Sequence, residues 1–208
     1  EQQNARPCGG NLGKVVSLTA SRLPPRPTGH FGVTRRRVSG LKRRYKLPST
    51  GSRCEAKMQV PQDFVDLLAA FGAAQVRYLV IGGYAVGAHS VPRFTKDIDL
   101  LIAADADNLV RCASALLAFG APSSVVDAMH NAERDDVIWM GNPPVRIDML
   151  QWIPGVSFAE AWPRHIDADW GGVTVHVIGL DDLIRAKDAA GRPQDRQDAK
   201  ALRKVRGD

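Results

Sequence analysis

Two aspartates, Asp97 and Asp99, stand two residues apart in the apolar segment 97–102 (DIDLLI), which is typical of a β-strand. Side chains alternate between the two faces of a strand, so these carboxylates point the same way while Ile98 and Leu100 point the other. Adjacent carboxylates repel each other and are costly to hold together unless a cation lies between them. Mg²⁺ is a hard cation that prefers oxygen ligands and accompanies phosphates. The pair therefore predicts a site for Mg²⁺, or for Mn²⁺ in its place.

A glycine pair, Gly82 and Gly83, precedes the aspartates. Segment 78–81 (YLVI) is predicted to be a short buried strand that breaks at these glycines, and segment 83–89 is predicted to be a helix. Glycine allows the backbone to come close to a ligand, and a new helix N-terminus offers free N–H groups to an anion. A phosphate cradle followed by a metal-binding acidic pair indicates a nucleotide-handling site.

A third carboxylate, Asp148, lies in a second strand-like segment, 145–150 (VRIDML). Two-metal phosphoryl transfer needs more than two carboxylates, because one metal positions the phosphates and the other activates the attacking hydroxyl. An acid inside an apolar segment also needs a partner. For Asp148 two partners stand open: Arg146 on the same strand face, or a metal shared with Asp97 and Asp99.

The order of these features resembles the signature of the nucleotidyltransferase superfamily with the DNA polymerase β-like fold. Segment 93–99 (RFTKDID) looks most like small bacterial members of the AbiEii/AbiGii toxin type. Segment 183–198 (LIRAKDAAGRPQDRQD) is similar to the ending of that group, where a lysine and an R-x-x-D element complete the site. The resemblance covers about residues 58–208. Thirteen residues separate Gly83 from Asp97, more than in the shortest versions of the motif.

The resemblance implies an α/β (α+β) fold in which a small mixed β-sheet is flanked by helices and followed by a C-terminal helical tail from about residue 180. It implies metal binding by all three aspartates, with Asp148 as metal ligand or general base. The implied catalytic set is Asp97, Asp99, Asp148 and Lys187. The implied nucleotide-binding set is Gly82, Gly83, Arg93, Thr95, Lys187, Arg192 and Asp195.

The activity implied is transfer of a nucleoside monophosphate from an NTP to a hydroxyl, with release of pyrophosphate. The toxin-type resemblance suggests the 3′ end of tRNA or a partner protein as acceptor, and a cognate antitoxin as a possible partner. An antibiotic or another small molecule is the alternative acceptor. A nucleotide-binding or antitoxin-like module without turnover is a third hypothesis, but a pure binder has little need of three mutually repelling acids.

Simpler interpretations exist for each feature taken alone. The glycine pair could form a turn without a ligand, Asp97 and Asp99 a solvated strand edge beside Arg93 and Lys96, and Lys187 an ordinary surface lysine. Arg192 and Asp195 could be helix-boundary residues. The tryptophans are best explained as core or rim packing, although one could stack on a base. The histidines show no ligand spacing and are expected to be structural or exposed: His89, His130, His165 and His176.

Charge divides the chain into two parts. Residues 1–57 carry 13 Lys/Arg and 2 Asp/Glu, and residues 58–208 carry 15 and 20, so the balances are +11 and −5. The first part lacks hydrophobic periodicity and is predicted to be a disordered leader. It is either a leader without function, such as an extension upstream of Met58, or a basic arm for nucleic acid, or a targeting segment.

The rest of the chain is predicted to be a single domain. Helices are expected at 61–71, 83–89, 105–119, 158–162, 181–190 and 194–205, and Asp105 resembles the cap of the third. Strands are expected at 78–81, 97–102, 137–140, 145–150 and 173–178, and 137–140 and 145–150 resemble a hairpin. No apolar run is long enough for a membrane span, so no membrane partner is expected. Three scattered cysteines show no disulfide or zinc spacing, which suits the cytoplasm.

Overall fold

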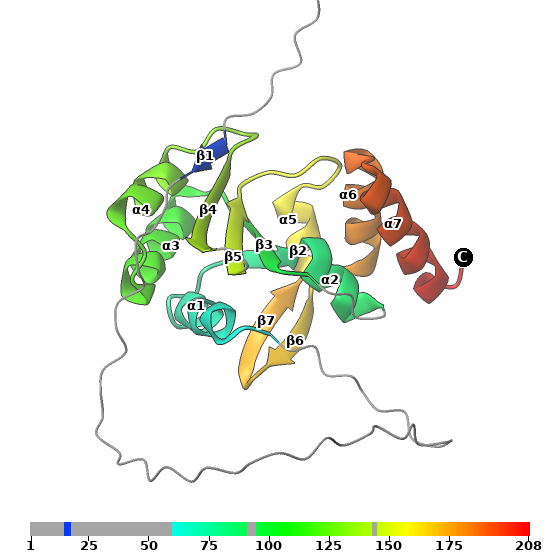
Figure 1. Cartoon of the computed structure of the whole chain (residues 1–208), viewed down its shortest axis with the longest axis horizontal. Helices are drawn as coiled ribbons and strands as arrows, with labels where there is room; N and C mark the ends of the chain where they lie inside the picture. Colours follow the sequence, from blue (N-terminus) through cyan, green and yellow to red (C-terminus); the bar gives the residue numbers. More distant parts are fainter. Residues whose placement is uncertain (1–14, 18–59, 91–94, 143–144) are drawn as a thin grey trace, which may run out of the picture.

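One mixed sheet carries the fold in the computed structural model, which describes residues 15–17, 60–90, 95–142 and 145–208 (Figure 1). Its seven strands lie in the order β1-β4-β5-β3-β2-β7-β6. The strands are β1 (Val15–Ser17), β2 (Tyr78–Ile81), β3 (Asp97–Ile102), β4 (Val137–Asn142), β5 (Val145–Leu150), β6 (Ile166–Trp170) and β7 (Val173–Val177).

The centre of the sheet is β3, which lies antiparallel to β2 and parallel to β5. The register places Ile81 beside Asp99 and Asp99 beside Asp148. Strands β4 and β5 form the hairpin expected from the sequence, although its turn residues 143–144 lie outside the described residues. The sheet is therefore mixed, as predicted, and its register brings two of the three aspartates together.

Helices cover the sheet and extend it at one end (Figure 1). Helix α1 packs against α3 and β7, whereas α6 and α7 pack against each other at the opposite side of the picture from α3 and α4. Among the described residues, no helix is both long and apolar enough to cross a bilayer. The helices are α1 (Gln62–Ala73), α2 (Gly82–His89), α3 (Ala106–Phe119), α4 (Ser123–His130), α5 (Phe158–Ala161), the 3₁₀ helix η1 (Trp162–Arg164), α6 (Leu180–Ala190) and α7 (Pro193–Arg206).

The core forms where the apolar faces of α1 and the strands meet. Phe64, Leu67, Leu68 and Phe71 are fully buried, which confirms the helical spacing predicted for 61–71. All four residues of β2 are buried as well. Burial on both faces explains why its sequence is continuously apolar instead of alternating between apolar and polar residues. The mixed sheet, its flanking helices and the helical tail confirm the α/β architecture expected from the sequence.

Strands β1 and β6, helix α4 and the 3₁₀ helix η1 were not predicted. Strand β6 (IDADW) has three exposed residues out of five and lies at the sheet edge, so little apolar pattern marks it. Helix α4 buries only Val125 and Met129. Strand β1 lies within the basic leader and pairs with β4 through its backbone. The disorder predicted for the remainder of residues 1–57 concerns residues outside the described ranges.

Asn108, in the first turn of α3, joins the helix to the ends of two strands. Its Oδ1 accepts a hydrogen bond from the backbone N–H of Arg77 at 2.7 Å, and its Nδ2 donates to the carbonyls of Arg77 and Ala103 at 3.1 and 2.9 Å. The side chain is fully buried. The predicted cap Asp105 accepts a hydrogen bond from the Asn108 backbone N–H. This cap and the hydrogen bonds of the Asn108 side chain together hold the N-terminus of α3 in place.

Asn108→Ala is expected to lower the free energy of unfolding by about 2–4 kcal/mol, because it leaves buried backbone groups without partners. Urea unfolding of the variant and the parent chain measures the difference. Asn131→Ala is the matched control, since the Asn131 amide donates to the Asp127 carbonyl at an exposed site. The control is expected to change stability by less than about 1 kcal/mol. Equal losses for both variants would contradict the structural role of Asn108.

Candidate active site

Three carboxylates gather on β3 and β5 because of the sheet register. Asp97 and Asp99 alternate with the fully buried Ile98 and Leu100, as predicted for one strand face. Asp148 is the direct cross-strand neighbour of Asp99, and it is 7% exposed. The structure thus brings together the three acids that the sequence analysis proposed as metal ligands.

Arg146 neutralises part of this charge. Its Nη2 donates to Asp148 Oδ2 at 2.8 Å, and its Nε lies 2.7 Å from Asp148 Oδ1 without the geometry of a hydrogen bond. The same Nη2 lies 3.6 Å from Asp97 Oδ2. Arg146 is therefore one partner of Asp148, as one of the two sequence hypotheses required. Metal binding, the other hypothesis, stays a prediction.

The remaining negative charge shows in the pKa values. Burial raises the pKa of Asp99 to about 6, with repulsion from Asp148 adding to the rise and the Lys187 ammonium opposing it. Burial also raises the pKa of Asp148, against the lowering effect of Arg146. Carboxylates that lie this close together favour the binding of a cation, because it relieves their mutual repulsion. Their oxygen-only donor set fits a hard divalent ion such as Mg²⁺.

Gly82 allows the carboxylate of Asp99 to lie against the start of α2. The residue has φ +63°, and a Cβ built on it would lie 1.9 Å from Asp99 Oδ2. No other amino acid fits this position without displacing the carboxylate. The sequence analysis predicted a close backbone approach at the glycine pair, and here the approaching group belongs to the protein itself. Gly83 follows in the first turn of the helix.

A buried network of opposite charge lies on α6 and α7. The Lys187 ammonium lies 2.9 Å from Asp195 Oδ1 and 3.0 Å from Asp198 Oδ2, and Arg192 Nε donates to Asp195 Oδ2 at 2.5 Å. Both carboxylates and the lysine are more than 90% buried. Lys187 is therefore not the ordinary surface lysine of the simpler interpretation, and Asp195 holds both cations in place.

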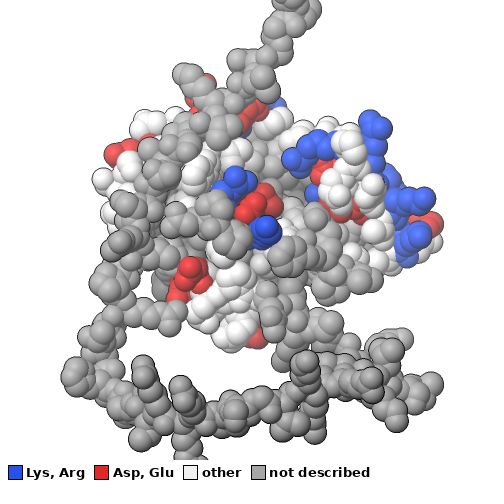
Figure 2. Space-filling model, viewed as in Figure 1, with Lys and Arg blue, Asp and Glu red and all other residues white. Residues whose placement is uncertain are grey.

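The two networks face one cavity of about 720 Å³. Figure 2 shows acidic and basic side chains close together in the middle of this face and further basic ones over α7. Arg93 lies outside the described residues, so its predicted role has no structural counterpart. The cavity lining includes every other predicted site residue: Gly82, Gly83, Thr95, Asp97, Asp99, Asp148, Lys187, Arg192 and Asp195.

Asp135 was missed from the sequence, whereas Trp152 is one of the tryptophans expected in the core or at the rim. Asp135 and Trp152 form part of the wall beyond β4 and β5, and the Arg134 guanidinium lies 4.3 Å from the Trp152 ring centroid. These residues stand in irregular segments and carry no motif. Asp198 also went unnoticed, although its spacing from Asp195 places both on one helix face, a signal that was available.

Two of the four histidines lie close together in the fold. His165 and His176 show no recognised ligand spacing along the chain, but the hairpin of β6 and β7 brings them to the same carboxylate, that of Asp167. His89 is structural as expected, because its Nε2 lies 2.6 Å from the Ile178 carbonyl. Trp170 is a core residue, also as expected.

No protein-family model matches the chain, and a search of curated proteins by sequence finds no match. Among solved structures, the antibiotic-resistance factor ANT(2'')-Ia in solution is similar at 16% identity over 69% of this chain and 80% of the other, with a TM-score of 0.41. ANT(2")-Ia in complex with adenylyl-2"-tobramycin is similar at 16% identity over 70% and 92%, with a TM-score of 0.42. An antigenic nucleotidyltransferase-like protein from Paracoccidioides brasiliensis is similar at 15% identity over 69% and 74%, with a TM-score of 0.41. These TM-scores and identities are low, so the assignment of the site rests on its own side chains.

Gly82→Ala is expected to destabilise the chain by about 1–3 kcal/mol and to weaken binding of Mn²⁺, because the new methyl group displaces the Asp99 carboxylate and the backbone is strained at positive φ. Urea unfolding and Mn²⁺ titration followed by electron paramagnetic resonance measure the two effects. Gly72→Ala in α1 is the control, since nothing lies within 4 Å of its built Cβ. Normal Mn²⁺ binding by Gly82→Ala would contradict the role assigned to the glycine.

The raised pKa of Asp99 predicts a pH dependence of stability. Between its unfolded pKa of about 3.9 and its folded pKa of about 6, the folded state binds more protons than the unfolded state, so the free energy of unfolding falls as pH rises through this window. Because the carboxyl is only partly buried, we expect about 1–2 kcal/mol. Urea unfolding near pH 4 and pH 7 with chelator present should show this loss in the parent chain and not in Asp99→Asn. Parallel pH profiles for the two chains would contradict it.

Proposed function

We propose that this chain is a metal-dependent nucleotidyltransferase that moves a nucleoside monophosphate from an NTP to a hydroxyl and releases pyrophosphate. The observation that carries the proposal is that three carboxylates on adjacent strands face a buried lysine and an arginine across one cavity. Such a site matches the two needs of phosphoryl transfer, which are cation binding beside the reacting phosphate and positive charge for the leaving group.

The carboxylates would hold the metal. Asp97, Asp99 and Asp148 supply hard oxygen ligands for Mg²⁺ or Mn²⁺, which when bound would polarise the phosphoryl oxygens and neutralise charge in the transition state. Gly82 leaves the space that the Asp99 carboxylate occupies. Arg146 balances the acidic group when no metal is bound, so the strands can hold three acids side by side.

Asp148 is proposed to accept the proton of the attacking hydroxyl. Its raised pKa makes it more basic than an ordinary carboxylate, and each of its oxygens keeps a lone pair beyond the one that faces Arg146. The hydroxyl oxygen forms a bond to the α-phosphorus, and the bond from that phosphorus to the bridging oxygen of pyrophosphate breaks. Asp148 carries the proton away in the same exchange.

Lys187 and Arg192 are proposed to stabilise the triphosphate and the departing pyrophosphate. Lys187 makes two ion pairs and also lines the cavity, so the third N–H of its ammonium would donate to a phosphate there. Asp195 anchors both cations, which would keep them in position before the nucleotide arrives. Gly82 and Gly83, with the N–H groups at the start of α2, would contact the phosphates from the opposite wall.

The acceptor is proposed to be of the toxin type, either the 3′ end of tRNA or a partner protein, with an antitoxin as a possible regulator and the cytoplasm as its setting. Three cations on α7, Arg196, Lys200 and Lys204, are exposed and favour an RNA acceptor, since they extend positive charge outward from the cavity. The other wall favours a small molecule, because Asp135 and Trp152 suit an uncharged or cationic acceptor better than a polyanion.

The test offers the full chain each NTP labelled at the α-phosphate, with Mg²⁺ and one of three acceptors: total tRNA, the protein itself, or a panel of small hydroxylated molecules. Label is expected on one acceptor class, and Asp97→Asn and Asp148→Asn are each expected to lower the rate by about 10³-fold or more. Asp127→Asn, an Asp→Asn change outside the cavity lining, is the matched control and should keep the parent rate.

Transfer that survives both Asp97→Asn and Asp148→Asn would contradict the assigned site. Chelator-sensitive NTP binding without product on any acceptor would instead favour the hypothesis of a binding module. Label on tRNA and label on a small molecule separate the two acceptor classes directly. The NTP that gives the highest rate identifies the nucleotide.

A further inference from the structure

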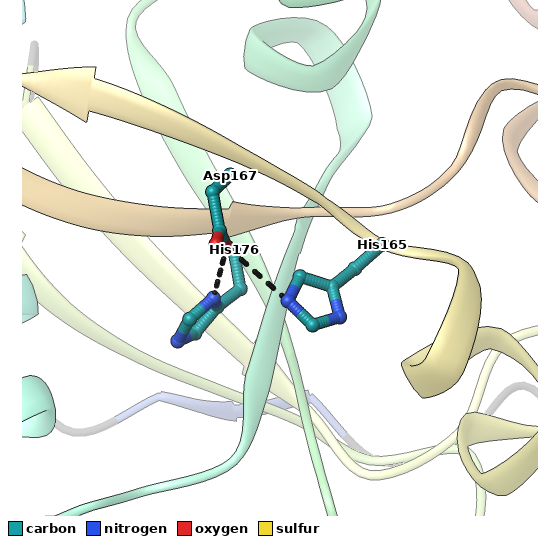
Figure 3. A group of neighbouring side chains, drawn as sticks. All are labelled: His165, Asp167 and His176. Atoms are coloured by element: carbon teal, nitrogen blue, oxygen red, sulfur yellow. Dashed lines mark hydrogen bonds and ion pairs between the residues drawn. The ribbon is translucent and has the colours of Figure 1, made fainter.

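A second group of ligand-type side chains lies on the β6–β7 hairpin (Figure 3). The His165 Nε2 lies 3.2 Å from Asp167 Oδ1, and the His176 Nδ1 lies 2.7 Å from the same oxygen. One ligand atom from each of the three residues lies within 4.8 Å of the other two. Figure 3 shows both imidazole rings turned toward the Asp167 carboxylate.

The hydrogen-bond roles of His165 point to a cation. Its Nδ1 contacts the Trp162 carbonyl, which can only accept, so this nitrogen carries a proton. In a neutral ring the Nε2 then presents a lone pair, and that lone pair faces a carboxylate oxygen. Two acceptors in contact need either a second proton on the ring or a metal ion between them. A neutral His165 ring therefore cannot form a hydrogen bond with Asp167 through Nε2.

The rings are held in position by neighbours that do not bind a metal. The Trp162 ring stacks on His165 with centroids 4.5 Å apart and 23° between the planes, and His176 lies against Tyr78 at 5.5 Å. The Nδ1 contact with the Trp162 carbonyl is the kind of outer contact that fixes the tautomer of a metal-bound histidine and leaves Nε2 for the ion. The site is thus preorganised by its surroundings.

We propose that His165, Asp167 and His176 form a binding site for a zinc-type transition-metal ion, distinct from the active-site cavity. Two imidazole nitrogens and one carboxylate oxygen are ligands that Zn²⁺ accepts, whereas Mg²⁺ prefers oxygen alone. With metal–ligand bonds of about 2.0 Å, tetrahedral ligands lie roughly 3.3 Å apart. The 3.2 Å between His165 Nε2 and Asp167 Oδ1 is close to that value, whereas His176 Nδ1, at 2.7 Å from the same oxygen, would have to move outward to admit the ion.

The site has room for a fourth ligand. The Asp167 side chain is 60% exposed, and His165 and His176 are 21% and 27% exposed, so water reaches the ligand atoms. An ion bound here would join the end of η1 to both strands of the hairpin. Three protein ligands and one water form a common zinc arrangement.

The site is independent of the proposed function, because none of its three residues lines the cavity. It also differs in chemistry, since it contains nitrogen ligands and the active site contains only carboxylates. Occupancy of one site can therefore be measured while the other is saturated or disabled, and failure of either proposal leaves the other standing.

The test is equilibrium dialysis of the full chain against Zn²⁺ in excess Mg²⁺. Asp167→Asn and His176→Asn are each expected to bind one Zn²⁺ fewer per chain than the parent, or to bind it at least about tenfold more weakly. His130→Asn, a His→Asn change at an exposed histidine outside the cluster, is the matched control and should bind as the parent does. Asp97→Asn should also keep this zinc, which would distinguish zinc bound at the histidine cluster from metal bound at the active-site carboxylates.

A second measurement uses the parent chain alone, in case a variant fails to fold. Diethyl pyrocarbonate modifies accessible imidazoles, and mass spectrometry locates the modified residues. Zn²⁺ is expected to protect His165 and His176 and to leave His130 reactive. Equal zinc binding by the cluster variants and the parent would overturn the proposal, and so would unprotected histidines at saturating Zn²⁺, because the cluster would then be held by protons alone.

Discussion

Like charge held at close range is the constraint on which the rest of this structure depends. Asp99 and Asp148 are neighbours across two parallel strands, and Asp97 stands two residues away on the same face. The apolar sheet beneath them supplies rigidity but no charge compensation. That compensation comes from Arg146 on one side and, at longer range, from Lys187 on the other. Removal of Arg146 would raise the pKa of Asp148, and removal of Lys187 would raise that of Asp99.

The helical tail completes the site rather than merely following it. Asp195 and Asp198 on α7 hold the ammonium of Lys187 on α6, and Arg203 pairs with Asp188 between the same two helices. Because the lysine and its two partners are buried, their geometry is set by the packing of α6 on α7. The helix pair therefore sets the position of Lys187, whereas the sheet sets the positions of the three aspartates.

Residues with local signals could be predicted from the sequence. The strand-glycine-helix unit, the alternation around Asp97 and Asp99, and the cap at Asp105 each depend on neighbouring residues, and the structure contains all of them. What could not be predicted depends on tertiary contact. Three such contacts join residues that lie far apart in the sequence. They are the register of β3 on β5, the ion pairs of Lys187 with α7, and the shared contact of His165 and His176 with Asp167.

The ion pair of Arg146 with Asp148 has a further consequence for how a cation would enter. An empty acidic pocket would simply gain an ion, but this one already contains a positive group bound to Asp148 and close to Asp97. Entry of the proposed metal would then be an exchange of one cation for another, and its affinity would reflect the difference between two attractions. A nucleotide arriving with its metal would also bring anionic phosphate for the displaced guanidinium. Binding of the ion would in that way favour binding of the nucleotide, and the reverse, because Arg146 would exchange a carboxylate for a phosphate.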